Sequence, residues 1–199
     1  MKTKINIWLA VFASIVLTAC STSVERLDSQ DQVDLSGAWN DTDSQLVARE
    51  MIEDSLSRAW ISQFVSKEGK EPAVIVGKIK NLSHEHINTN TFIADMEREL
   101  INSGEVQFVA SASARQEIRD ERGDQDLNAT EDTRNAMGAE YGADFIMQGQ
   151  INTIIDVDGK TQVRYYQVNL ELVSIKDNRK VWIGQKKIKK LVKNSKLRE

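Results

Sequence analysis

The stretch that decides the fold is residues 143–192, ADFIMQGQINTIIDVDGKTQVRYYQVNLELVSIKDNRKVWIGQKKIKKLV. β-Branched and aromatic residues fill three runs of strand length within it. Two short turn signals, Asp158-Gly159 and Asp177-Asn178, separate these runs. The sequence therefore predicts three consecutive antiparallel strands, at 143–156, 161–175 and 180–192.

The middle strand shows the clearest alternation of apolar and polar residues. Val168, Leu170 and Leu172 fall on one face, and we place Val163 and Tyr165 on the same face. Tyr165 and Val168 are three residues apart rather than two. This interpretation therefore requires a β-bulge between Tyr165 and Val168.

Upstream of this meander, helical and strand patterns alternate. Apolar residues at helical spacing predict one long helix over 44–67, with Asp41 or Asp43 as its cap. Further elements are expected as a strand at 72–81, a helix at 90–102, a strand at 105–110, and helices at 111–123 and 130–143.

The predicted order of elements is α-β-α-β-α-α-β-β-β. It indicates an α/β fold in which helices pack on one mixed sheet of about five strands. The first two strands are expected to pair in parallel through the helix at 90–102, because a parallel pair needs a crossover connection. The last three strands are expected to be antiparallel.

The N-terminus, MKTKINIWLAVFASIVLTAC (1–20), is typical of a secreted bacterial lipoprotein. Two lysines precede an apolar run at 5–17, which is too short to span a bilayer of roughly 20 apolar residues. The residues Leu17, Thr18, Ala19 and Cys20 resemble the lipobox, which is cut before the cysteine. Cys20 is then expected to carry a diacylglycerol thioether and an N-acyl chain. The alternative is an ordinary signal peptide with a chance cysteine.

These features divide the chain into a signal peptide at 1–19, a lipidated N-terminus and flexible tether at 20–34, and a single globular domain at 35–199. Ser21 follows the cysteine, which by the sorting rule of enteric-type bacteria favours the periplasmic face of the outer membrane. Fully extended, residues 21–34 reach about 45–50 Å.

Composition narrows the possible partners. The formal net charge is −4, and 28% of residues are charged, as on an ordinary soluble surface. The acidity and the export signal argue against a nucleic-acid partner. Cys20 is the only cysteine, so the chain forms no internal disulfide.

No catalytic motif is present: the sequence lacks a nucleophile elbow, a zinc-protease helix and a phosphate loop. His84 and His86 flank Glu85 and could share a metal, but the sequence supplies no third ligand. A solvated polar loop is the simpler interpretation of these residues. We therefore expect no enzyme activity, no cofactor, no metal site and no small-molecule substrate.

Two segments are candidates for partner contact. The first comprises Trp39, Asn40, Asp41 and Asp43, just after the tether. Its tryptophan could anchor a partner, or it could be a hydrophobic staple into the core. The second is the basic tail at 186–199, which is either an edge strand protected by lysines or a contact for an anionic surface.

Four stretches, together with the lipobox and polar tether, resemble the LpoB family of outer-membrane lipoprotein activators of penicillin-binding proteins. They are LSGAWNDTDSQLVAREMI (35–52), the helix–strand unit at 90–110, EYGADFIMQGQI (140–151) and VNLELVSIKDNRKVWIGQ (168–185).

This resemblance implies a non-enzymatic lipoprotein that docks on a bifunctional penicillin-binding protein and stimulates peptidoglycan synthesis. It also implies a fold similar to the N-terminal domain of the periplasmic protein TolB. The short tether leaves an alternative open, a structural or assembly lipoprotein of an envelope machine such as a secretion or flagellar apparatus. An envelope enzyme or metal-binding protein using His84 and His86 is the third possibility.

Overall fold

The structure, a computed structural model, describes residues 24–28, 31, 33–135, 138 and 140–193. The chain forms two units, Met1–Gln32 and Val33–Glu199. In the first unit, the Asp31 amide donates to the Asp28 carbonyl at 3.1 Å. The second unit holds all the helices and strands described below and begins two residues before the boundary expected from the sequence. The predicted cleavage motif and Cys20 lie outside the described residues.

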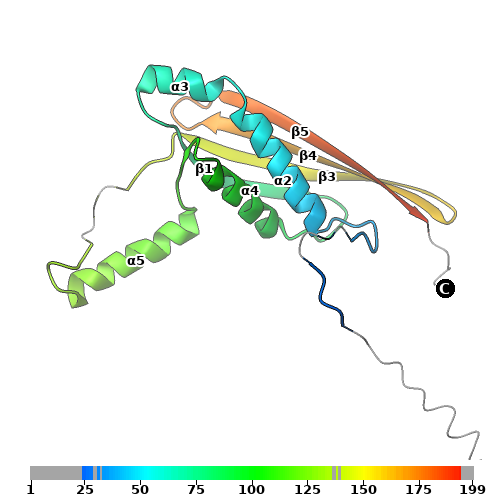
Figure 1. The fold of residues 1–199 in the computed structure, drawn as a ribbon, viewed down its shortest axis with the longest axis horizontal. Coiled ribbons are helices and arrows are strands. Elements are labelled where there is room, and N and C mark those ends of the chain that lie inside the picture. The colour runs from blue at the N-terminus through cyan, green and yellow to red at the C-terminus, as the bar shows by residue number, and fades with distance from the viewer. Residues whose placement is uncertain (1–23, 29–30, 32, 136–137, 139, 194–199) are drawn as a thin grey trace, which may run out of the picture. The chain divides into compact units, whose positions relative to one another are not determined.

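A five-stranded mixed sheet organises the second unit, with the strand order β2-β1-β3-β4-β5 (Figure 1). β1 pairs in parallel with both β2 and β3, whereas β3, β4 and β5 form an antiparallel meander. The predicted mixed sheet and its pairing are thus confirmed. The strands are β1 Ala73–Leu82, β2 Gln107–Phe108, β3 Phe145–Asp158, β4 Thr161–Ser174 and β5 Lys180–Lys193.

Both predicted turns of the meander are present. Gly159 has a φ of +55° and Asn178 a φ of +60°, and these are the residue types that tolerate the left-handed region. The predicted bulge between Tyr165 and Val168 is wrong, because β3 and β4 pair without a break along their whole length. Tyr166, not Tyr165, faces the core in phase with Val168. Two adjacent tyrosines left the phase of the strand ambiguous in the sequence.

Four helices accompany the sheet in the described part of the second unit. They are α2 Asp41–Leu56, α3 Trp60–Glu68, α4 Thr89–Ser103 and α5 Ala112–Asn128. The expected helix at 130–143 is wrong, because its described residues form turns and irregular chain. Tyr141, its largest side chain, is 56% exposed, so no apolar face was available to hold a helix on the core.

The single helix predicted over 44–67 is in fact two helices, α2 and α3. The Trp60 indole N–H donates to the Ser55 carbonyl at 2.8 Å, which removes that acceptor from a continuous helical ladder. The change of direction lets Trp60 and Phe64 pack edge-to-face on Phe145, with centroids 5.1 and 5.2 Å away. Burial of two aromatic rings therefore decides where the helix breaks.

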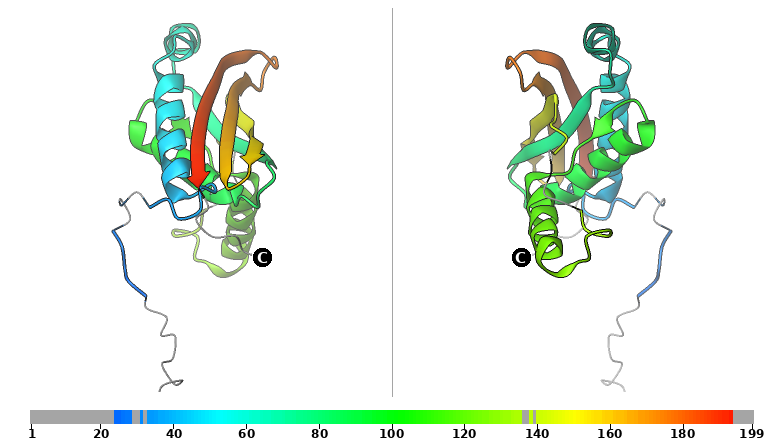
Figure 2. Two further views of the ribbon diagram at one scale, coloured as in Figure 1. Left: turned by 90° about the vertical axis from the view of Figure 1, so that its right-hand side faces the viewer. Right: turned by 90° about the vertical axis from the view of Figure 1, so that its left-hand side faces the viewer.

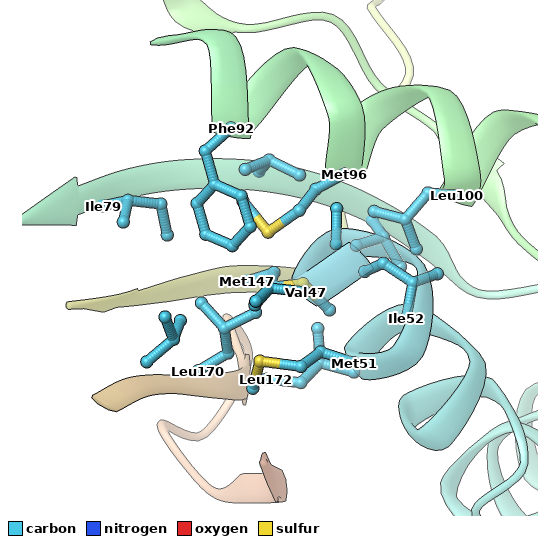
Figure 3. Packing of buried hydrophobic residues seen from close by; sticks show 14 of the residues in the cluster. Val47, Met51, Ile52, Ile79, Phe92, Met96, Leu100, Met147, Leu170 and Leu172 are labelled. Atoms are coloured by element: carbon cyan, nitrogen blue, oxygen red, sulfur yellow. The ribbon is translucent and has the colours of Figure 1, made fainter. Parts of the chain in front are cut away.

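The core lies between the sheet and the helices α2 and α4, which lie side by side on one of its faces (Figures 1 and 2). Figure 3 shows apolar side chains of α2 and α4 packed against those of the sheet. The fully buried members of this core include Val47, Ile52, Phe92, Met96, Leu100, Met147, Leu170 and Leu172.

The opposite face of the sheet carries polar side chains. Gln148, Gln150, Asn169 and Glu171 point to this side and none of them is buried. Gln148 donates to Glu171 at 2.9 Å, and Gln185 of β5 donates to Asn169 at 2.9 Å. Such a face is typical of an antiparallel sheet that packs its core on one side only.

Candidate functional site

The segment 33–40, called here the leading segment, joins the tether to α2 and lies against the ends of β4 and β5. Asn40 is its last residue and the N-cap of α2. The Asn40 side chain accepts from the Asp43 amide at 3.0 Å, and the Asp43 carboxylate accepts from the Asn40 amide at 3.0 Å. This capping box starts the helix three residues earlier than predicted and corrects the expected cap, Asp41 or Asp43.

Lys190 of β5 connects the leading segment to the sheet. Its Nζ lies 2.6 Å from Asp43 Oδ2 and 2.7 Å from Asp34 Oδ1, and it donates to the Ala38 carbonyl at 3.2 Å. The lysine side chain is only 10% exposed. Burial alone lowers the pKa of Lys190, but the hydrogen bonds to Asp34 and Asp43 outweigh it, and the net pKa lies above the usual lysine value.

Glu85, in the loop between β1 and α4, accepts from three donors, one in the leading segment and two in β4. Its Oε2 accepts from the Trp39 amide at 3.1 Å, and its Oε1 accepts from Arg164 at 2.9 Å and from the Tyr166 hydroxyl at 2.7 Å. The side chains of Glu85 and Arg164 are about one-fifth exposed, at 18% and 21%. This carboxylate therefore ties the leading segment to β4 through short, charge-assisted hydrogen bonds.

An aromatic contact lies beside these polar groups. The Trp39 ring packs edge-to-face against Phe92 of α4 and Tyr166 of β4, with centroids 6.0 and 5.7 Å away. The Tyr166 hydroxyl oxygen, whose one proton has its shorter contact with Glu85, also lies 3.3 Å from the Gly37 carbonyl oxygen. Burial, together with the hydrogen bond to Glu85, raises the pKa of Tyr166, so this hydroxyl stays a neutral donor at physiological pH.

The structure brings the predicted partner-binding residues together but turns most of them inward. Trp39 packs on the core, as the hydrophobic-staple alternative expects, and Asp43 is buried against Lys190. Asn40 is half-buried at the helix cap, whereas Asp41 is exposed in the first turn. The set thus fixes the leading segment on the domain, and Asp41 is its solvent-facing member.

The histidines of the same loop do not form a metal site in the described structure. His84 Nδ1 lies 2.9 Å from Thr153 Oγ1, and His86 is exposed. Across the ranges that the structure describes, no three His, Cys, Asp or Glu side chains are grouped to hold a metal ion. The hydrogen bond to Thr153 accounts for His84 as a structural residue of the loop.

Sequence reasoning missed Arg164, Tyr166 and Lys190, and it assigned Glu85 to a solvated loop. One signal was available: Lys190 and Lys186 occupy inward positions of an alternating strand, where an unpaired lysine is rare. Lys186 indeed pairs with Glu50 of α2. The partners of these lysines lie more than a hundred residues away in the sequence. The sequence could therefore show that the lysines occupy inward positions, but it could not identify their partners.

Comparisons with known proteins give the family. The family described as "Peptidoglycan-synthase activator LpoB" matches residues 43–188 of this chain. No curated protein sequence matches this chain. Among the described residues, no helix combines the length and apolar character that a membrane crossing requires.

Solved structures are also similar, at low identity. The lipoprotein GNA1162 from Neisseria meningitidis is 15% identical, with a TM-score of 0.41 over 63% of this chain and 87% of that one. The LpoB C-terminal domain from Escherichia coli is 13% identical, with a TM-score of 0.38 over 71% and 97% of the two chains. The NMR structure of E. coli LpoB is 11% identical, with a TM-score of 0.40 over 89% and 84%.

The family assignment is based on the sequence match, which covers well over half of the chain, and not on these structural similarities. That match runs from Asp43 of the capping box to Ile188, and so includes β1 to β4 and the first part of β5. The chain belongs to the family of the peptidoglycan-synthase activator LpoB.

Proposed function

We propose that this chain is a lipid-anchored periplasmic regulator that binds a bifunctional penicillin-binding protein and activates its peptidoglycan synthesis. The observation that carries the proposal is the family match over residues 43–188. A non-enzymatic mode of action agrees with the site described above, whose polar groups hold one segment of the chain against another. The protein then acts by contact, with no cofactor and no small-molecule substrate.

The anchor is part of the proposal. Cleavage after Ala19 and acylation of Cys20 place the domain at the periplasmic face of the outer membrane, which is the membrane of this family. Two or three acyl chains anchor a protein stably, since each buried CH₂ contributes about 0.8 kcal/mol. The compact unit begins at Val33, so residues 21–32 reach at most about 40–43 Å from the lipid.

Asp41 is the residue of the predicted partner set that we propose to touch the synthase. It is exposed at the N-terminus of α2, next to the leading segment that emerges from the tether. Glu53 lies on the same helix and is also exposed, but it is more than three turns away. Substitutions of Asp41 and Glu53 remove the same charge at different places. Comparing them therefore distinguishes a contact at the start of α2 from a general effect of charge.

The test is glycan polymerisation by a bifunctional penicillin-binding protein, with and without the full-length lipoprotein in detergent. We expect the wild-type protein and Glu53→Ala to raise the polymerisation rate several-fold. Asp41→Ala should give weaker activation at the same protein concentration, with unchanged thermal unfolding. Pull-down of the synthase by the wild-type lipoprotein should accompany activation.

A polymerisation rate that stays constant at saturating lipoprotein would refute activation. The assembly-lipoprotein alternative, favoured by the short tether, then becomes the better hypothesis. It predicts co-purification with an envelope machine and normal peptidoglycan synthesis in a deletion strain. If activation holds but Asp41→Ala behaves like wild type, only the proposed contact is wrong.

A further inference from the structure

A second surface lies at the other edge of the sheet, away from the leading segment. The helix α5 and the edge strand β2 border a cavity of about 310 Å³. Apolar parts of its wall come from Phe108, Ile118 and Tyr141. Figure 1 shows α5 standing apart from the layer formed by α2 and α4, and it buries none of its own residues. Core packing therefore does not explain the position of α5 beside this cavity.

Three arginines of α5 surround a single carboxylate at this cavity. Arg119 binds Glu140 in a bidentate pair, with Nε–Oε1 and Nη2–Oε2 distances of 2.6 and 2.7 Å. Arg115 and Arg122 lie one helical turn on either side, 4.0 and 3.9 Å from the same carboxylate. Three guanidinium groups against one carboxylate leave an excess of two positive charges.

Arg115 is the member of this cluster with unsatisfied hydrogen-bonding capacity. Its Nε is buried and has no hydrogen-bond partner within the described chain. A buried guanidinium N–H without an acceptor costs free energy, and a carboxylate supplies the strongest acceptor for it. The Arg115 Nε–H therefore lacks one acceptor, which a carboxylate of a ligand can supply.

The strand edge beside the arginines offers backbone groups. The amides of Gln107 and Val109 donate to the carbonyls of Pro72 and Val74, each at 2.9 Å. Alternate residues of a strand direct their backbone groups to opposite sides, so those of Phe108 point away from β1. An extended chain can pair with an edge of this kind.

We propose that this pocket binds an extended acidic segment of a partner protein as an added strand against β2. The backbone groups of Phe108 pair with the segment, Phe108 and Ile118 contact its apolar side chains, and Arg115 and Arg122 bind its carboxylates. Glu140 occupies part of the arginine cluster in the free protein and competes with the incoming carboxylates. This site is separate from the proposed activation of a synthase, and its test does not depend on that proposal.

The test measures binding of fluorescein-labelled (Val-Glu)₃ peptide to the full-length protein in detergent, by fluorescence anisotropy. The double variant Arg115→Gln/Arg122→Gln should bind about tenfold more weakly, since charge-assisted contacts are lost. Glu140→Gln should bind about threefold more tightly, because the competing carboxylate is gone. Arg98→Gln on α4, an exposed arginine that does not line the cavity, is the matched control and should bind as wild type.

The effect of Glu140→Gln separates a ligand site from a purely structural ion pair. If the arginines serve only to hold α5, the wild type binds no peptide and Glu140→Gln creates no binding, which overturns the proposal. Should the double variant unfold, Arg115→Lys/Arg122→Lys keeps the charge and should show intermediate affinity. Bound peptide should also slow hydrogen exchange at the Phe108 amide.

Other occupants give different results. Inorganic phosphate that displaces the peptide at equal concentration, without protection of Phe108, identifies a general anion site and overturns strand addition. Sedimentation as a dimer that Arg115→Gln/Arg122→Gln dissociates identifies a second copy of this chain as the occupant and overturns the partner segment. Equal binding of (Val-Lys)₃ also contradicts the proposal.

Discussion

At the residue scale, one lysine on an inward face of the sheet holds the N-terminal part of the domain. Lys190 joins Asp34, Ala38 and Asp43, so its ammonium group links β5 to the leading segment and to the start of α2. Lys189, the next residue, points outward and is exposed. The two neighbours therefore have the same chemistry and opposite structural roles.

Replacing Lys190 by methionine should lower the free energy of unfolding by about 2 kcal/mol, because the buried Asp43 carboxylate loses its cation. Lys189→Met should change the same quantity by less than about 0.5 kcal/mol, as surface substitutions do. Urea unfolding of the two variants at pH 7 measures the difference. Equal effects of both variants would show that the ion pair contributes no stability.

The contribution of this ion pair to the free energy of unfolding should depend on pH. The pKa of Lys190 is raised in the folded protein, so its contribution is full below the unfolded value of about 10.4 and is lost as the pH rises through the folded pKa. The raised pKa of Tyr166 acts in the same direction, so the comparison is made in the Tyr166→Phe background. There, stability should fall as the pH rises above about 10.4, and Lys190→Met should make that fall shallower. A parallel loss in both proteins would contradict the assignment.

Gly37 is a position where only glycine fits the observed backbone. Its φ is +66°, and a Cβ there would lie 2.3 Å from Val192 Cγ2. Gly37→Ala should therefore destabilise the domain by about 1–3 kcal/mol through strain and overpacking. The double variant Gly37→Ala/Val192→Ala should recover part of that loss in thermal unfolding, because it removes the steric contact but not the backbone strain. If the double variant is no more stable than Gly37→Ala, the positive φ at position 37 accounts for the whole loss.

At the element scale, α4 and α5 are helices of similar length and opposite dependence on the core. α4 buries Phe92, Met96 and Leu100, whereas α5 buries no residue. An isolated helix of this length is marginal in water, so α5 should open locally far more often than α4.

Proline scanning tests this contrast at exposed positions. Asp120→Pro in α5 should cost less than about 1 kcal/mol of global stability, because little of the core depends on that helix. Arg98→Pro in α4 should cost about 3 kcal/mol or more, since the break propagates to the buried face. Both are measured by urea unfolding monitored by tryptophan fluorescence. Similar losses would mean that α5 is part of the same cooperative unit.

At the scale of the whole molecule, the proposed lipid anchor at Cys20 sets a limit on how far the domain can reach to a partner. Deleting residues 24–31 removes most of the chain between Cys20 and Val33 and leaves the compact unit intact. We expect this variant to activate a detergent-solubilised synthase as wild type does, because the domain is unchanged. In cells that depend on the lipoprotein, the same variant should fail to complement.

Complementation by the deleted variant would show that the tether does not set the reach of the domain. A variant with residues 24–31 replaced by a Gly/Ser stretch of equal length controls for sequence, and it should complement. Impaired activation in detergent would instead mean that the segment itself contacts the synthase.

The sequence determined by itself the class of fold and the antiparallel pairing of the last three strands, because both have local causes. Alternation specifies a strand, and Asp-Gly and Asp-Asn turns bring consecutive strands together, so β3, β4 and β5 were predictable. The strict two-residue period also made Lys190 stand out on an inward face, although its partners could not be inferred.

Only the tertiary structure decided where the helices break and which polar residues meet. The long predicted helix breaks before Trp60 because Trp60 packs on Phe145, which lies 85 residues later in the sequence. Glu85 gathers Trp39, Arg164 and Tyr166 from opposite ends of the domain. Contacts at such separation have no local signature, because the fold of the sheet, and not the spacing of residues, places these groups together.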